Sequence, residues 1–437
     1  MNRKNIKKIG LVIYMFLAIF EPPILPVPFI YILGIYTIVF FVLKYKTIIP
    51  LSIPKKSGVL SLTKSFSIIL FYLLFVNIID VFFIEHANLT ANRFRCINQL
   101  VVLTFIQFLE IWYIFLCSDE LNYQLSDIFK ILTIVGAMQG VCAFIAYNVP
   151  SIRRLFVRFG DQTLFNNAYF IERRGYGFSM TLIDTFGYGM GLIAGYILLQ
   201  KWTDKKIGRI IALSLTLFAI FVNARTGIVI FGISVILKVL QGKNKFKQFL
   251  KLVIAVPSAY YVIYYLLPVI LKRGVKSANI TIKWVFTDLQ ELYTALIVGS
   301  SSNASLSNAS FFSNFGNLPK NIFEFVFGSG HSIYDTTKVL GFRTDVGYIN
   351  LWWEFGFMGL AIILLIMLTL MMKALRYADD IYIKSIVVLN IISYFIVQFK
   401  AILIGYNPGV FINYLVLFAV QYYYFSNIDL RIKKRKE

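Results

Sequence analysis

One segment of the sequence is rich in arginine and contains no lysine. Residues 148–180 hold five arginines against two acids, Asp161 and Glu172. The five are Arg153, Arg154, Arg158, Arg173 and Arg174. A guanidinium binds phosphate or carboxylate through two parallel N–H bonds, which an ammonium does not match. The segment predicts a site for an anionic ligand, and the alternative is that these side chains meet lipid phosphates at a membrane interface.

The end of this segment adds flexible backbone and an aromatic ring to the charge. Arg173 and Arg174 precede a Gly-Tyr-Gly-Phe sequence that contains Tyr176. This composition favours a ligand that carries both negative charge and sugar. Asp184 follows at the start of an apolar segment, where an unpaired acid is costly and therefore a functional candidate. The alternative is that Asp184 pairs with one of the arginines.

A second group of reactive side chains lies near the end of a long segment, 271–346. His331 is one of only two histidines and follows a Gly-Ser-Gly turn. Arg343 and Asp345 come just before the next apolar run, and Glu354 lies about two turns inside it. A histidine or a carboxylate within reach of a hydroxyl acts as a general base. Asp345 and His331 are therefore the candidate bases, although an isolated histidine is also commonly just solvated.

A further arginine stands in a very short turn. Arg225 lies within Asn-Ala-Arg-Thr-Gly, which joins two apolar segments with almost no loop. Both segments hold it near a membrane surface, so it is a candidate for binding an anionic group. An arginine that snorkels from a helix end is the alternative.

The elements that position these residues are predicted to be membrane helices. Hydrophobic residues make up 58% of the 437 and charged residues only 15%, with a mean hydropathy of +0.73, which excludes an ordinary soluble domain and disorder. About twelve segments have the length and apolarity of a span. They are 9–26, 28–43, 65–84, 97–116, 128–147, 181–199, 207–222, 227–240, 252–270, 347–372, 381–399 and 410–425. We expect an all-α polytopic membrane protein, a single domain over 1–437.

The distribution of cations predicts the orientation. More than half of the 43 lysines and arginines fall in the short segments that face one side if both termini are cytoplasmic. The formal charge of +22 is then mostly a topology signal, and no nucleic-acid partner is expected. Both 148–180 and 271–346 become outer loops. Within the larger one we expect short amphipathic helices, including 320–327 ending at Gly328. Gly356 and Gly359 are interpreted as sites of close helix packing.

At these residues the chain resembles the O-antigen polymerase and O-antigen ligase superfamily of bacterial membrane glycosyltransferases. Its Asn-Ala-Arg225-Thr-Gly hairpin is similar to the family's Arg-[Ser/Thr]-Gly motif. The large outer loop lies between the ninth and tenth of twelve spans, as in that family. The loop exit, from Gly328-Ser329-Gly330 to Asp345-x-x-Tyr348-x5-Glu354-x-Gly356-x-x-Gly359, is also similar. Ligases typically carry histidine where this chain has Asp345, which favours a polymerase. An Arg-x10-Gly pattern described in some polymerases is absent.

The resemblance implies a GT-C-like architecture and a lipid-linked substrate. A polyprenyl-pyrophosphate-linked oligosaccharide would sit in the bilayer of the bacterial inner membrane, with its sugars on the outer side. An acceptor hydroxyl would attack the anomeric carbon with inversion and expel pyrophosphate. Pyrophosphate would bind Arg173, Arg174, Arg225 and Arg343, and Arg225 would also assist catalysis. Sugars would contact Tyr176, Asp184, Tyr348 and Glu354.

The same reading implies partners and leaves two rival functions. A chain-length regulator and a flippase are the expected protein partners. No acidic or histidine cluster has metal-ligand spacing on the predicted outer side, so we expect transfer without metal or other cofactor. One rival is a ligase that moves finished glycan to another acceptor. The other is a flippase for the same lipid-linked sugar.

Overall fold

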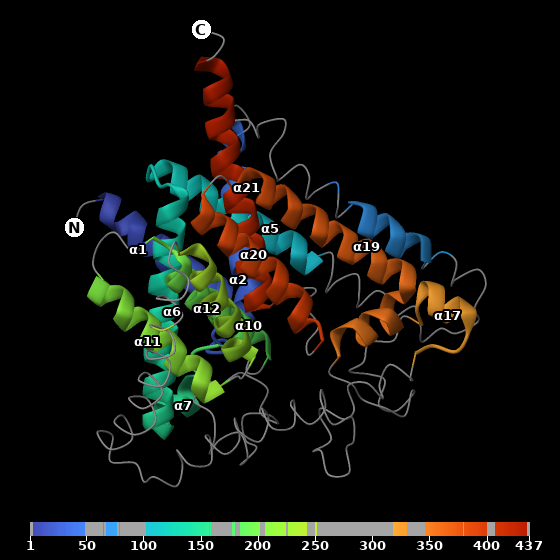
Figure 1. The fold of residues 1–437 in the computed structure, drawn as a ribbon, viewed down its shortest axis with the longest axis horizontal. Helices are drawn as coiled ribbons and strands as arrows, with labels where there is room; N and C mark the ends of the chain where they lie inside the picture. The colour runs from blue at the N-terminus through green and yellow to red at the C-terminus, as the bar shows by residue number, and fades with distance from the viewer. Residues whose placement is uncertain are drawn as a thin grey trace.

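A computed structural model describes most of the helical part of the chain (Figure 1). The described residues are 3–48, 67–76, 102–156, 177–179, 184–201, 206–223, 226–242, 318–329, 346–378, 380–399 and 407–434, with the single residues 64, 78, 158 and 250. Within these ranges all regular secondary structure is helical and no strand occurs. The predicted all-α class is confirmed for this part of the chain.

The helices coincide with the apolar segments of the sequence. Each expected span except 252–270 overlaps a described helix, and 252–270 lies outside the described residues. The longer helices are α1 (Arg3–Phe20), α2 (Phe29–Ile48), α5 (Leu103–Glu120), α6 (Leu125–Asn148), α10 (Asp184–Leu199), α11 (Lys206–Asn223), α12 (Thr226–Gln241), α19 (Gly347–Tyr377), α20 (Ile381–Val397) and α21 (Pro408–Lys434). Two short helices are α7 (Pro150–Phe156) and α17 (Ile322–Phe327). The latter confirms the short helix expected over 320–327.

Three of these helices are long and apolar enough to cross a bilayer, namely α6, α11 and α19. Other described helices, among them α10, α12 and α20, are apolar but shorter. Many large apolar side chains face outward, for example Leu43 at 80% and Ile207 at 75% exposure. Outward apolar faces on several helices suit a lipid environment. The chain has the character of a membrane protein, and the number of twelve spans stays a prediction.

Helix α10 is the centre of the fold. It packs against α12, α11, α21, α20 and α6. A Cβ added to Gly191 would lie 3.0 Å from the Cα of Gly227, and one added to Gly195 would lie 3.1 Å from the Cβ of Ser234. Because these contacts advance together along both helices, α10 and α12 run in the same direction. Small residues permit this close approach in membrane helices.

Buried hydrogen bonds join α10 to the last two helices. The Tyr196 hydroxyl donates to Asn390 Oδ1 on α20 over 2.6 Å. The Asn413 amide on α21 donates to the Tyr188 hydroxyl over 3.0 Å. All four side chains are essentially inaccessible to solvent. In such surroundings polar groups need partners, so these pairs fix how α20 and α21 sit on α10.

The ends of four helices that are predicted to be cytoplasmic meet in a polar cluster. Lys7 on α1 and Lys44 on α2 contact Glu120 at the end of α5, over 2.7 and 3.2 Å. Beside them the Tyr422 hydroxyl of α21 donates to Asp119. These contacts place the four helix ends together, and their cytoplasmic orientation stays a prediction.

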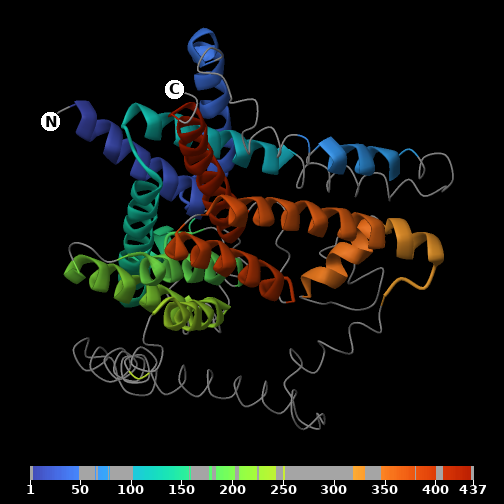
Figure 2. The ribbon, with the colours of Figure 1, turned by 45° about the horizontal axis from the view of Figure 1, so that its top comes forward.

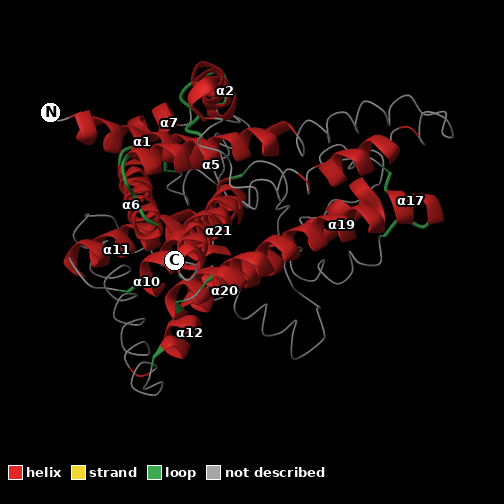
Figure 3. Ribbon diagram, turned by 90° about the horizontal axis from the view of Figure 1, so that it is seen from above, coloured by secondary structure: helices red, strands yellow, loops and turns green. Residues whose placement is uncertain are grey.

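A smaller unit lies at the far end of α19. Helix α19 extends away from α6 and α11, and α17 packs beside its distant end (Figures 1 and 2). The view from above shows the same arrangement (Figure 3). There the helix at 67–76 packs on α19 through Ile69, Leu73 and Phe355. A Cβ on Gly359 would lie 2.9 Å from the Tyr72 ring, which agrees with the close packing expected at Gly359. Gly356 differs, because it breaks the helix with φ +68°.

Candidate functional site

The described part of the predicted loop exit packs on the start of α19. Both the backbone N–H and the hydroxyl of Ser329 donate to the carbonyl oxygen of Trp353, over 2.8 and 2.9 Å. The Trp352 indole donates to the Phe325 carbonyl of α17 over 3.0 Å. These bonds hold the end of α17 and the turn after it against the second turn of α19.

Two glycines form the centre of this contact. Gly328 has φ +83° and Gly356 has φ +68°, a region that side-chain-bearing residues rarely adopt. A Cβ on Gly328 would lie 2.5 Å from the Gly356 nitrogen, and one on Gly356 would lie 2.3 Å from the Val326 carbonyl oxygen. At the helix break, the backbone of Gly356 therefore contacts the backbone at the end of α17 directly. Glycine at both positions is a steric requirement of this arrangement.

Glu354 lies between these contacts. It follows Trp353, the acceptor of the Ser329 bonds, and precedes the break by two residues. Its side chain is half-buried. Glu354, predicted to contact the acceptor or its sugar, thus sits where the loop exit is anchored.

The described residues on either side of 330–345 are both held by the first two turns of α19. Ser329 bonds to Trp353, and Val346 is the N-cap of the helix. Along an α-helix these positions are about 10 Å apart, from a rise of about 1.5 Å per residue. The predicted bases His331 and Asp345, and with them Arg343, lie outside the described residues.

Tyr348 is engaged with α20. Its hydroxyl donates to the Phe395 carbonyl over 2.9 Å, and its backbone N–H donates to the Gln398 carbonyl over 3.3 Å. Its ring also lies edge-on to Phe399, at 4.8 Å between centroids. In this structure Tyr348 fixes α19 on α20, and its expected contact with a sugar stays a prediction.

The hairpin around Arg225 packs beside the start of α10. Arg225 itself lies outside the described residues, but Asn223 ends α11 and Thr226 begins α12. A Cβ on Gly227 would lie 2.8 Å from the carbonyl oxygen of Gly187, one turn after Asp184. The structure therefore brings the described neighbours of Arg225 and the helix that Asp184 begins into contact. The side chain of Asp184 is not among those described.

The arginine-rich loop is closed by an aromatic contact. Its first turns form α7, whose last turn contains Arg153 and Arg154. The rings of Phe156, at the end of α7, and Phe178 lie 4.5 Å apart. The Phe178 N–H also donates to Gln139 Oε1 of α6 over 3.3 Å. Both described ends of the loop thus meet beside α6, whereas Arg173, Arg174 and Tyr176 lie outside the described residues.

Two buried acids were not among the site residues predicted from the sequence. Glu110 of α5 has 0% and Glu21 has 7% exposure, and the two carboxylates interact electrostatically. In the part of the chain that the structure describes, both carboxyl oxygens of Glu110 and the Oε1 atom of Glu21 lack a hydrogen-bond partner. Gln107, one turn before Glu110, is equally without one. The rule that selected Asp184, an acid within an apolar segment, would have found Glu110 too.

Across the described ranges, no three His, Cys, Asp or Glu side chains are grouped closely enough to hold a metal ion. Comparison with protein-family models and with curated proteins gave no match.

Proposed function

We propose that this protein is a polymerase that joins polyprenyl-pyrophosphate-linked oligosaccharide repeat units at the outer face of a bacterial inner membrane. The observation that carries the proposal is the anchoring of the loop exit on α19. Gly328, Ser329, Glu354 and Gly356, all part of the stretch that resembles the polymerase and ligase superfamily, form one contact. Residues far apart in that stretch are therefore neighbours in space.

In the proposed reaction an acceptor sugar hydroxyl attacks the anomeric carbon of the donor. A carbon–oxygen bond forms, and the bond from that carbon to the pyrophosphate oxygen breaks, so the configuration inverts. The proton of the hydroxyl passes to Asp345 or His331. Arg173, Arg174, Arg225 and Arg343 stabilise the negative charge that develops on pyrophosphate. Removing one such electrostatic contact typically lowers the rate by about 10²–10³.

The packing of the described neighbours of these residues supports the assignment. Gly227, next to the Arg225 turn, lies against the first turn of α10, which Asp184 begins. Phe178, four residues after Arg174, is fixed on α6 and α7. Packed residues thus lie two positions from Arg225 and four positions from Arg174.

The proposal is tested with purified protein and purified lipid-linked repeat units in detergent. Polymer is followed by gel ladder for wild type, Arg225→Lys, Arg174→Lys and Asp345→Asn. The matched control is Arg376→Lys, an exposed cation in the last turn of α19. We expect chains from wild type and the control, and losses of about 10²-fold or more in the other three. Unchanged chain length and amount in both site arginine variants would remove them from the site.

The same assay separates the rival functions. Detergent removes the barrier between leaflets, so a flippase gives no product in it. A ligase requires a second acceptor and leaves single repeats unjoined. In cells, deletion of a polymerase leaves one repeat on the surface, whereas deletion of a ligase leaves long lipid-linked polymer. Either rival pattern would overturn the proposal.

A further inference from the structure

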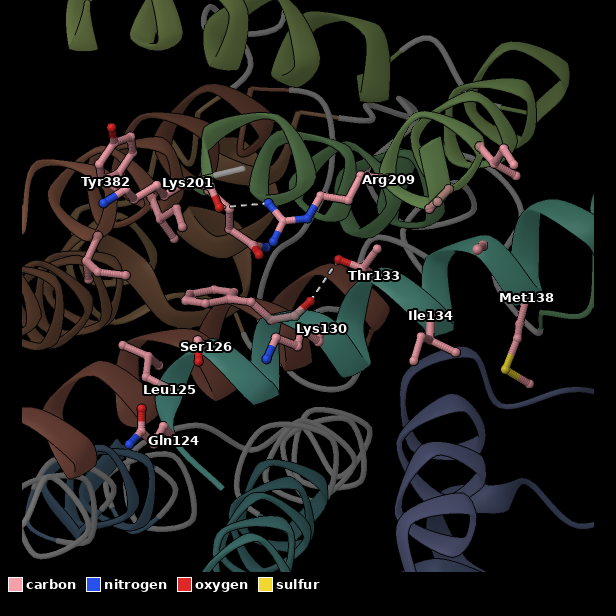
Figure 4. A pocket seen from close by; sticks show the side chains of 18 of the residues that line it. Gln124, Leu125, Ser126, Lys130, Thr133, Ile134, Met138, Lys201, Arg209 and Tyr382 are labelled. Carbon is pink, nitrogen blue, oxygen red and sulfur yellow. Dashed lines mark hydrogen bonds between the residues drawn. The ribbon is translucent and has the colours of Figure 1, made fainter. Parts of the chain in front are cut away.

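A large cavity lies beside the ends of α6 and α11 that are predicted to be cytoplasmic. Its volume is about 1350 Å³, above the usual range for small-molecule pockets, and it is bordered mainly by α6, α11 and the start of α20 (Figure 4). It begins near Gln124, at the predicted cytoplasmic end of α6, and reaches Cys142. Along α6 the lining residues run from Leu125 to Cys142, a distance of about 26 Å. The cavity thus follows most of the length of this helix.

The deeper wall is apolar and faces outward. Ile134, Met138 and Val141 of α6 line it, together with Ile211 of α11. Three of them remain well exposed, Ile134 at 48%, Val141 at 42% and Ile211 at 54%. Figure 4 shows Ile134 and Met138 continuing along α6 away from the charged end. Such a wall accommodates a hydrocarbon chain and offers nothing to a soluble anion.

The shallow end is cationic. Arg209 of α11 reaches toward Lys201, and its Nη1 donates to the Lys201 carbonyl oxygen over 2.9 Å (Figure 4). Among the described residues, this neutral carbonyl is the only hydrogen-bond partner of the guanidinium, and Arg209 lies near enough to Lys238 of α12 for the two charges to repel each other. In the same part of the chain, the Lys238 ammonium contacts the carbonyls of Leu199 and Gln200, over 3.4 Å, and the Tyr382 ring.

Two described acids lie at this end. Asp380 lines the cavity and caps α20, its Oδ1 accepting from the Tyr382 N–H over 3.1 Å, which leaves its negative charge in place. Asp127 is paired with Lys130 over 2.8 Å. Beside that pair, the described residues that line the cavity include two cations, Lys201 and Arg209, and one acid, Asp380, so this end has a net positive charge.

We propose that the cavity binds an anionic glycerophospholipid from the leaflet predicted to be cytoplasmic, with its phosphate on Arg209 and Lys201 and an acyl chain along Ile134, Met138 and Val141. A phosphate accepts two parallel bonds from a guanidinium. A zwitterionic lipid would bring its own cation next to Arg209 and Lys201. The inference goes beyond the polymerase reaction and does not depend on it.

The test is lipid binding to the full-length protein. Wild type in nonionic detergent is titrated with phosphatidylglycerol or phosphatidylcholine of identical acyl chains, and binding is read by native mass spectrometry and by the melting temperature. We expect phosphatidylglycerol to bind about tenfold more tightly, because both lipids carry the phosphate but only phosphatidylcholine adds a cation beside Arg209 and Lys201. Its advantage is expected to shrink at high salt.

Two variants and a control locate the site. Lys201→Gln with Arg209→Gln is expected to reduce the preference to less than twofold. Lys201→Gln alone changes only an exposed side chain, so it tests the site if the double variant does not fold. Arg376→Gln, a cation at the same predicted side on α19, is expected to leave the preference unchanged. Val141→Trp is expected to weaken the binding of both lipids, because the larger side chain narrows the cavity along its apolar wall.

Several outcomes overturn the proposal. Equal binding of the two lipids assigns the cavity to general hydrocarbon contact, and a preference that is undiminished in both variants places the anionic lipid on another surface. Displacement of phosphatidylglycerol by millimolar inorganic phosphate assigns it to a free anion. Binding of a polyprenyl monophosphate tenfold more tightly than phosphatidylglycerol assigns it to a different lipid class.

Discussion

Gly328 and Gly356 face each other so closely that a Cβ on either would lie 2.4–2.5 Å from the other's backbone nitrogen. Both have positive φ angles. The contact joins the turn after α17 to the break in α19. It leaves no room for a side chain, so it is the most sensitive point of the candidate site.

Replacing Gly356 with alanine is expected to destabilise the protein by more than about 2 kcal/mol, because strain at positive φ and overpacking combine. The measurement is the melting temperature in detergent. Gly232→Ala is the matched control, since a Cβ there would meet nothing within 4 Å and alanine is the better helix former. Equal melting of Gly356→Ala and wild type would show that α17 does not pack on α19 in this way.

The buried pair of Tyr196 and Asn390 is expected to be worth about 1–3 kcal/mol, the cost of leaving Asn390 Oδ1 without its donor. Tyr196→Phe tests this, because it removes only the hydroxyl. Tyr31→Phe, on an exposed tyrosine of α2, is the control. The measurement is the melting curve of wild type and of both variants. A loss of stability in Tyr196→Phe no larger than that in the control would rule out the hydrogen bond.

The contacts of Glu120 with Lys7 and Lys44 are expected to contribute to stability in a pH-dependent way. The hydrogen bond from Lys7, with support from Lys44, lowers the pKa of the Glu120 carboxyl below its ordinary value of 4.5. Since the folded-state pKa is depressed, the stabilisation is present above pH 4.5 and lost as pH falls through the lower folded value. Side-chain exposures of 47% and 40% for Lys7 and Glu120 limit it to less than about 1 kcal/mol.

Melting temperatures of wild type and Glu120→Gln between pH 3 and 7 measure this contribution. The difference between the two should be small at neutral pH, vanish in acid and decrease with added salt. A difference that grows as the pH falls would contradict the assignment.

Glu110 is expected to cost stability. Its carboxyl group is fully buried and lies near a second acid, Glu21, so Glu110→Gln replaces a buried acid that no described cation accompanies. We expect the variant to melt at or above the wild-type temperature, in contrast to Glu120→Gln. A large loss of stability would show that the carboxylate has a stabilising partner. A loss of polymer formation at unchanged stability would place Glu110 in the function.

The positions of helices were predictable from apolar segments, and their contacts were not. Segments 128–147 and 207–222 match α6 and α11 within a few residues, because an uninterrupted apolar run of this length has few other structures. The parallel packing of α10 on α12 depends on which glycines face each other, which one sequence does not reveal. Gly356 was predicted to allow close helix packing, and the helix break there was not predicted, because glycine is common in both situations.

The candidate site was less predictable than the helices. Gly328, Ser329, Glu354 and Gly356 were recognised by resemblance, but their mutual contact follows from the turn after α17. Glu110 was overlooked because it lies in a segment with no other motif. Lys201 and Arg209 were assigned to topology alone, since a sequence does not show that an apolar cavity opens beside them.

The two anchors at Ser329 and Val346 have a consequence for how the protein diversifies. Because both are fixed by the first two turns of one helix, the intervening segment, 330–345, can change in length without moving either end. Doubling such a loop costs only about 0.6 kcal/mol in closure entropy. Under the proposed function, insertions, deletions and substitutions between the two anchors are expected to change which sugars bind while leaving the packing of α17 on α19 unchanged.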